Sequence, residues 1–217
     1  MKIGILGTGQ VGNLIGTRLI ENGHQVMMGG REANNQKGLD FVKNNSENAS
    51  YGTFKEVSNF GEIVFNATNG RFALDALRLA NTDFSDKIII DVANPLDFST
   101  KPPILIPEFA NTNSIGESIQ NLFPKAKVVK TFNTLAMALA VNPRQLNNGD
   151  HSLFVAGNDE NTKTKAMTLL TEFGWGIDNI IDIGDITAAR AMESYLILMA
   201  RLSMALKVPM FNIKVIK

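Results

Sequence analysis

The stretch Gly7-Thr8-Gly9-Gln10-Val11-Gly12 decides the predicted fold, because the residues on both sides of it have the patterns of a strand and a helix. The preceding Lys2–Leu6 is an apolar run of the buried type, and Val11–Asn22 carries apolar residues on roughly helical spacing. Gly23 ends this segment, and His24–Met28 resumes an apolar run. Strand, glycine turn, helix and second strand therefore follow one another as in a dinucleotide-binding βαβ unit.

Each glycine of this turn has a separate predicted role. Gly7 permits a tight turn, Gly9 lets the backbone approach a pyrophosphate, and Gly12 lets the helix lie close to the strand. The pyrophosphate would lie at the helix N-terminus, where free N–H groups and the positive end of the helix dipole favour an anion. The alternative is a glycine turn that binds no ligand.

The end of the second predicted strand indicates which dinucleotide would bind. An NAD site usually has Asp or Glu there for the ribose 2′-hydroxyl, whereas an NADP site offers Arg. This chain has Gly30 and Arg31 at that point, and a guanidinium pairs well with phosphate, so the sequence favours NADP. Glu32 comes one position later, where we expect it to point to solvent. Arg31 could instead be an ordinary solvated surface charge.

The overall composition excludes several classes of function. The 217 residues include 21 Lys plus Arg and 21 Asp plus Glu, so no charge excess suggests nucleic acid or a membrane surface as a partner. The absence of cysteine excludes disulfides, thiolate catalysis and cysteine-ligated metals, and two histidines without paired spacing predict no zinc site. The uncharged apolar stretch Tyr195–Ala200 is far too short to cross a bilayer. We therefore expect a soluble cytoplasmic protein without a metal.

Three later apolar segments end in, or lead into, small or polar residues, namely the strand Glu62–Gly70, the run and turn Asp86–Pro95, and the strand Lys127–Phe132. In a doubly wound sheet the carboxyl ends of the strands face the ligand crevice. The residues expected there are Ala67, Thr68 and Asn69; Ala93, Asn94 and Pro95; and Asn133, Thr134, Leu135, Ala136 and Met137. The last group suits a flat aromatic partner better than a charged metabolite. The first group could also be a capped turn, and Asn133 could equally cap a helix.

The remaining segments complete a predicted α/β, Rossmann-like, doubly wound and mostly parallel sheet with a C-terminal helical extension. We assign residues 1–140 to an NADP-binding Rossmann domain and 141–217 to an extension packed on the same sheet, with a long helix over Thr187–Leu206 and a dimer contact. The other predicted segments are a surface helix and loop over Ala33–Ser50, helices over Thr53–Phe60, Phe72–Leu79, Ser114–Phe123 and Asn161–Phe173, a long loop over Leu96–Phe109, strands over Ser152–Ala156 and Ile180–Ile183, and a final strand or docking tail over Phe211–Ile216.

Several blocks of the chain together resemble a known family. Besides Gly7–Gly12 and Gly30-Arg31, they are Ala67-Thr68, Asn94-Pro95, Val128–Ala136, Phe154–Asp159, Asp182–Asp185 and Ala189–Glu193. In this order they resemble the NADP oxidoreductases that include the coenzyme F-420-dependent NADP reductases and the cytosolic domain of six-transmembrane metalloreductases.

The resemblance implies an enzyme that passes a hydride directly between NADP(H) and a flavin or deazaflavin (F-420-type) ring. Carried over to this chain, Thr8–Val11 would contact phosphates and ribose, Gly30 and Arg31 the 2′-phosphate, and Ala67–Asn69 the central ribose region. Asn133–Met137 would frame the ring stack.

Two departures from the deazaflavin enzymes stand out. Those enzymes tend to have Ser-Arg where this chain has Gly30-Arg31, and Asn34-Asn35 replaces a following basic residue, so the phosphate clamp is thinner. They also favour a His-Thr-Ile-Pro-like turn where this chain has Asn133–Ala136, which is closer to the metalloreductase domain and its ordinary flavin.

Hydride transfer asks little of protein acid–base chemistry, which fits the lack of a Ser/His/Asp set or a paired carboxylate motif. We expect His24 and His151 to be packing or turn residues, and Arg190 and Glu193 to pair with each other or cap a neighbour. Two other functions remain open. A β-hydroxyacid-type dehydrogenase is disfavoured because Arg190 stands near the point where that family has a catalytic Lys. An NADP(H)-sensing module without turnover would use the same glycine turn.

Overall fold

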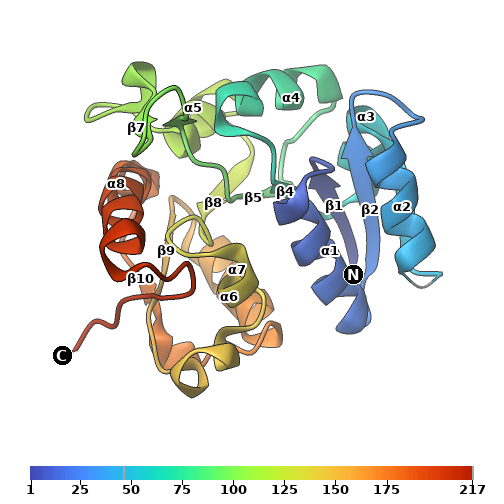
Figure 1. Cartoon of the computed structure of the whole chain (residues 1–217). Coiled ribbons are helices and arrows are strands. Elements are labelled where there is room, and N and C mark those ends of the chain that lie inside the picture. The colour runs from blue at the N-terminus through green and yellow to red at the C-terminus, as the bar shows by residue number, and fades with distance from the viewer. Residues whose placement is uncertain (46, 217) are drawn as a thin grey trace.

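In the computed structural model, which describes residues 1–45 and 47–216, one eight-stranded sheet runs through the molecule (Figure 1). The strand order is β10-β9-β8-β5-β4-β1-β2-β3, and every neighbouring pair is parallel except β8 with β9. The strands are β1 (Lys2–Leu6), β2 (Gln25–Gly30), β3 (Ala49–Thr53), β4 (Ile63–Asn66), β5 (Ile88–Asp91), β8 (Lys127–Lys130), β9 (Leu153–Gly157) and β10 (Ile180–Asp182). The predicted doubly wound, mostly parallel sheet is confirmed.

Helices cover both faces of this sheet, because successive side chains of each strand point to opposite faces. In β4, Ile63 and Phe65 belong to one hydrophobic core and Val64 to the other. The first core includes side chains of α1 (Gln10–Glu21), α2 (Gln36–Asn44) and α7 (Glu160–Glu172). The second includes side chains of α3 (Phe54–Phe60), α4 (Ala73–Ala80), α5 (Ile115–Leu122) and the start of α8 (Ala189–Leu206).

Strand β3 was not predicted, because its sequence Ala-Ser-Tyr-Gly-Thr has little apolar content. It forms by parallel pairing with β2, in which Met28 pairs with Tyr51 and Gly30 with Thr53. The expected helix and loop over Ala33–Ser50 therefore gives way to α2 followed by an edge strand. The predicted loop Leu96–Phe109 also contains a short antiparallel pair, β6 (Leu96–Asp97) with β7 (Ile104–Leu105).

The C-terminal part continues the same sheet through β9 and β10, and α8 follows at its edge (Figure 1). Residues 211–216 form no strand; they run beside the start of β9 in the same chain. The Ser152 N–H donates to the Ile213 carbonyl at 2.9 Å, and Asn212 Nδ2 donates to the Ser152 carbonyl at 2.8 Å. No helix in the described ranges is long and apolar enough to span a membrane.

Candidate functional site

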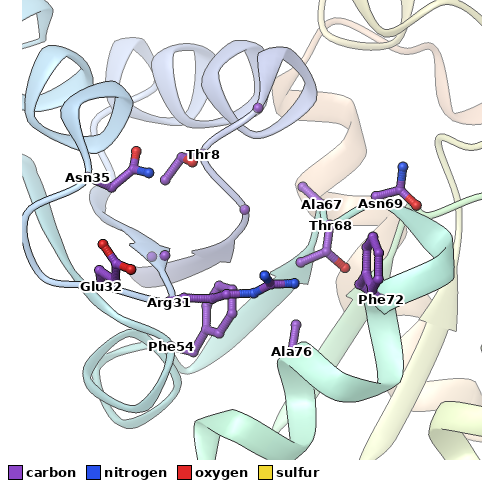
Figure 2. A pocket seen from close by; sticks show the side chains of 14 residues that line it. Thr8, Arg31, Glu32, Asn35, Phe54, Ala67, Thr68, Asn69, Phe72 and Ala76 are labelled. Carbon is purple, nitrogen blue, oxygen red and sulfur yellow. The ribbon is translucent and has the colours of Figure 1, made fainter.

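A cavity of about 390 Å³ opens where β1, β2 and β4 end (Figure 2). Its volume lies in the range of small-molecule sites. Eight of the predicted site residues line it, namely Gly7, Thr8, Gly9, Gly30, Arg31, Ala67, Thr68 and Asn69. Six further residues complete the lining: Gly29, Glu32, Asn35, Phe54, Phe72 and Ala76.

The geometry of the glycine turn fits the three roles predicted for it. Gly7 has a φ of +117°, and a Cβ there would lie 2.6 Å from the Ala67 carbonyl oxygen. A Cβ at Gly12 would lie 2.3 Å from the Gly7 carbonyl oxygen, so the start of α1 sits directly against the turn. A Cβ at Gly9 would meet no atom within 4 Å. The space above Gly9 at the N-terminus of α1 is therefore open to a ligand.

Arg31 and Phe72 both line this cavity, and the Arg31 side chain extends toward the Phe72 ring (Figure 2). The Arg31 Cζ lies 5.5 Å from the centroid of the Phe72 ring, within the range of a cation–π contact. Both side chains are exposed, so the guanidinium can reach an incoming anion. Glu32 is also exposed, as predicted, but it lines the cavity and brings a carboxylate to the edge that Arg31 occupies.

Tyr51 on β3 supports the turn that follows Arg31. Its hydroxyl donates to the Glu32 carbonyl, and Asn35 caps the following helix by accepting from the Gly38 N–H. A Cβ at Gly30 would lie 2.5 Å from the Tyr51 hydroxyl oxygen, so a side chain at the end of β2 would displace this hydroxyl. Burial and, in smaller part, the Glu32 charge raise the pKa of Tyr51, which keeps the phenol protonated as a donor.

The other predicted site residues lie outside this cavity, in three places. Gln10, Val11 and Gly12 belong to the first turn of α1. Ala93, Asn94 and Pro95 follow β5, and Asn133, Thr134, Leu135, Ala136 and Met137 follow β8.

The loops after β5 and β8 are joined by a reciprocal pair of hydrogen bonds. Asn94 Nδ2 donates to the Asn133 carbonyl at 2.9 Å, and Asn133 Nδ2 donates to Asn94 Oδ1 at 3.0 Å. The alternative role of Asn133 as a helix cap is wrong, because α6 (Met137–Ala140) begins after Ala136 with no side-chain cap. The two Asn side chains instead hold the two loops together.

Two buried oxygens next to this junction have no hydrogen-bond partner within the described part of the chain, Asn133 Oδ1 and Thr134 Oγ1. The two side chains are 2% and 1% exposed. Buried polar atoms are nearly always satisfied, and orphaned ones call for an explanation such as an absent ligand. Ala136 and Met137, immediately after them, are half-buried.

A buried cluster of charges lies beneath the loop after β5. Lys130 Nζ donates to Asp91 Oδ2 at 2.7 Å, to Glu193 Oε1 at 2.7 Å and to the Ala93 carbonyl at 2.5 Å. All three charged side chains are fully buried. Sequence reasoning missed this cluster; the signals were a lysine within the apolar run Lys127–Phe132 and an aspartate within the apolar run that follows Asp86.

Two carboxylates share one ammonium in this cluster, and burial together with these charges shifts the pKa values of Glu193 and Lys130. Burial raises the pKa of Glu193, against the lowering effect of Lys130. Burial alone would lower the pKa of Lys130, but the charges of Asp91 and Glu193 outweigh it and raise that pKa. Lys130 is therefore held as an ammonium, while Glu193 takes up a proton more readily than an exposed glutamate.

The predicted pairing of Arg190 with Glu193 is wrong, whereas the alternative of capping a neighbour is confirmed for Glu193 alone. Glu193 accepts from the Ile115 and Gly116 N–H groups at 3.0 and 3.3 Å, at the start of α5. Arg190 pairs with Glu117, which lies 73 residues away in sequence. Long-range contacts of α8 with α5 thus replace the local i, i+3 pair.

Both histidines have structural partners. His24 Nε2 lies 2.6 Å from Glu172 Oε2, and His151 Nε2 lies 3.0 Å from the Pro143 carbonyl with its ring against Trp175. Among residues 1–45 and 47–216 no group of His, Asp and Glu could hold a metal ion.

The chain is similar to several known proteins. Residues 2–95 match the family described as NADP oxidoreductase coenzyme F420-dependent. A proposed F420-dependent NADP-reductase from Arthrobacter sp. FB24, known from its crystal structure, is 41% identical, with a TM-score of 0.92 and full coverage of both chains.

Two curated relatives are more distant. The F420-dependent NADP reductase of Methanocaldococcus jannaschii is 27% identical over 89% of this chain and 88% of its own length. The metalloreductase STEAP3 of Rattus norvegicus is 28% identical over 89% of this chain, which spans 36% of that protein's length.

Proposed function

The chain belongs to the family of coenzyme F420-dependent NADP oxidoreductases, and on this premise we propose that it transfers a hydride between NADP(H) and a flavin or deazaflavin ring. The observation that carries the proposal is the arrangement of two neighbouring features at one sheet edge. One is the cavity with open space above Gly9 at a helix N-terminus. The other is the pair of buried, unpartnered oxygens of Asn133 and Thr134.

The first feature fits the adenosine half and the pyrophosphate of a dinucleotide. Phosphate oxygens would accept from the free N–H groups that begin α1, without needing a basic side chain. The adenine would lie at the mouth of the cavity over Arg31, since a guanidinium can stack on a flat ring. Gly9 matters because a side chain there would occupy the space a phosphate needs.

Arg31 favours NADP(H) over NAD(H), since its guanidinium can pair with a 2′-phosphate. Glu32 at the same edge opposes this preference, because its carboxylate would repel that phosphate. The neighbouring Tyr51 hydroxyl and Asn35 cap hold the turn in shape, but neither brings a positive charge. Selectivity for the 2′-phosphate therefore depends mainly on Arg31.

The second feature fits the ring stack. When bound, the nicotinamide supplies or accepts the hydride, and the chain's own residues hold it in place. Asn133 Oδ1 can accept from a carboxamide N–H, and Thr134 can both accept and donate. Ala136 is small and half-buried, which leaves room for a second flat ring over the first. Such positioning is the main catalytic contribution expected of the protein.

The proposal is tested by NADPH oxidation with three acceptors in turn: flavin mononucleotide, flavin adenine dinucleotide and the 5-deazaflavin F420. We expect turnover with at least one of them and slower turnover with NADH. Absence of turnover with all three, in protein that binds NADPH, would favour the sensing module. The acceptor that works decides between a deazaflavin and an ordinary flavin.

The β-hydroxyacid dehydrogenase alternative gains no support from the site. Arg190, near the point where that family has its catalytic lysine, is engaged by Glu117 through two hydrogen bonds. The buried Lys130 is likewise committed to Asp91 and Glu193. Within the described residues, neither side chain is placed to act on a hydroxyacid.

We also propose a cytoplasmic homodimer that contacts its second copy through the end of α8. Several apolar side chains there are exposed, including Leu198, Met204 and Leu206, followed by Val208 and Met210. Such a patch on an outer helix favours a protein contact. Light scattering on the purified protein checks the oligomeric state, and Met204→Glu should shift a dimer to monomer.

A further inference from the structure

A chain of buried hydrogen bonds leads from the charge cluster to the wall of the cavity. Asp91 Oδ1 accepts from Asn66 Nδ2 at 2.7 Å. Asn66 Oδ1 in turn accepts from the Thr68 hydroxyl at 2.7 Å and from the Thr68 N–H at 3.4 Å. Asp91 and Asn66 are fully buried, whereas Thr68 is half-buried and lines the cavity (Figure 2).

We propose that Asp91 is a positioning residue for the dinucleotide: it fixes the direction of these hydrogen bonds, so that Thr68 presents only lone pairs to a ribose hydroxyl. This inference rests on the proposed NADP(H) site. At Thr68, the cavity wall would then select ligands that carry a hydrogen-bond donor.

The direction follows from the chemistry of the groups. An ionised carboxylate only accepts hydrogen bonds, so Asn66 must turn its NH₂ group toward Asp91 and its oxygen toward Thr68. The Thr68 hydroxyl has one hydrogen, and it donates that hydrogen to Asn66 Oδ1. What remains on the cavity side of the hydroxyl is acceptor capacity alone.

The partners of Asp91 require an acceptor at both of its carboxylate oxygens. The Lys130 ammonium requires an acceptor at Asp91 Oδ2, while Asn66 Nδ2 and the Ala93 N–H both require one at Oδ1. An amide at position 91 has only one oxygen, which would face the ammonium. Its NH₂ group would then meet the NH₂ group of Asn66. The Asn66 amide would flip in response, so Asn66 Oδ1 would no longer accept from the Thr68 hydroxyl.

Glu193 provides a matched control, because it shares Lys130 but lies outside this chain of hydrogen bonds. Its other partners are the Ile115 and Gly116 N–H groups at the start of α5. Asp91→Asn and Glu193→Gln each remove one buried carboxylate and leave Lys130 paired with the other. Only the first change alters the partner of Asn66.

The experiment measures the Kd of NADP⁺ by titration calorimetry in wild type, Asp91→Asn, Glu193→Gln, Thr68→Val, Thr68→Ser and the double variant Asp91→Asn/Thr68→Val. Thr68→Val should raise Kd about three- to tenfold, the value of one hydrogen bond, and Thr68→Ser should restore it. Asp91→Asn should raise Kd similarly in the wild-type background. In the Thr68→Val background it should change Kd by less than about twofold, since the two changes remove the same interaction.

Three results would overturn the inference while leaving NADP(H) binding intact. The first is an unchanged Kd in Thr68→Val. This variant changes no fully buried residue, so the result can be obtained even if Asp91→Asn fails to fold. The second is an equal effect of Asp91→Asn in both backgrounds. The third is a rise in Kd in Glu193→Gln as large as that in Asp91→Asn, which would mean that the charge cluster supports the fold in general. Wild-type protein that binds no NADP⁺ would refute the proposed function itself.

Discussion

The guanidinium of Arg31 lies over the ring of Phe72, with Cζ 5.5 Å from the ring centroid, although the two residues come from different βα loops. This contact places a positive charge at the mouth of the cavity. An arginine held in this way is already oriented for a ligand, so little ordering of its side chain opposes binding.

Arg31→Ala should reduce the preference for NADPH over NADH by about tenfold, because it removes a charge-assisted hydrogen-bond donor to the 2′-phosphate. The ratio of kcat/KM for the two nucleotides measures this preference. Arg78→Ala is the control, since Arg78 is an exposed arginine on α4 that pairs only with Asp75 among the described residues. An unchanged ratio in Arg31→Ala would contradict the assigned role.

Tyr51→Phe should raise the KM for NADPH about three- to tenfold with little effect on kcat, because the lost hydroxyl no longer holds the Glu32 carbonyl. The turn that carries Arg31 would then be less well ordered. Tyr195→Phe is a matched control, since the Tyr195 hydroxyl has no hydrogen-bond partner within the described ranges. Equal effects of the two substitutions would refute the positioning role of Tyr51.

Ala136→Phe should lower kcat for hydride transfer by at least about tenfold, because a large ring at this half-buried position takes the space of the second flat ring. Affinity for NADP⁺ should stay within about twofold, since its phosphates and adenosine bind elsewhere. Ala191→Phe, at an exposed position on α8, should change neither quantity. Full activity in Ala136→Phe would mean that the acceptor binds at another place.

Lys130→Met should lower the free energy of unfolding by about 3–5 kcal/mol, because it leaves two buried carboxylates without their counter-ion. Urea unfolding measures the change. Lys163→Met is the comparison, since Lys163 is also buried but pairs with Glu160 and Asp182, which are 81% and 32% exposed. Water can solvate those partners, so we expect a loss of about 1 kcal/mol or less there.

Glu193→Gln should flatten the pH dependence of stability above pH 4.5, the ordinary pKa of a glutamate. Because burial raises the pKa of Glu193 in the folded protein, the folded state holds this proton more tightly than the unfolded state. The stabilisation is thus present below pH 4.5 and is lost as the pH rises through the folded-state pKa. Unfolding free energies from pH 4.5 to 7 should fall more steeply in wild type than in the variant, and parallel curves would contradict the expectation.

Sequence alone was sufficient for the first βαβ unit and for the existence of the later central strands. Gly7 and Gly12 are required because a Cβ at either position would clash, at Gly7 with Ala67 and at Gly12 with the turn itself. Because such local constraints permit only glycine, the glycine spacing predicts the turn. The apolar runs predicted β1, β4, β5 and β8 because each strand is buried on both faces. Their order along the chain, with intervening helices, then led to a doubly wound sheet.

Tertiary structure alone decided which distant residues meet. Strand β3 carries little hydrophobic signal and exists because β2 offers it a pairing edge, and through it Tyr51 reaches the turn after Arg31. Asp91, Lys130 and Glu193 come from β5, β8 and α8, and no local pattern joins an aspartate, a lysine and a glutamate so far apart. Periodicity reports whether a residue is buried, because burial repeats along one element. It does not report the partner of a buried charge, because that partner is set by how the elements pack.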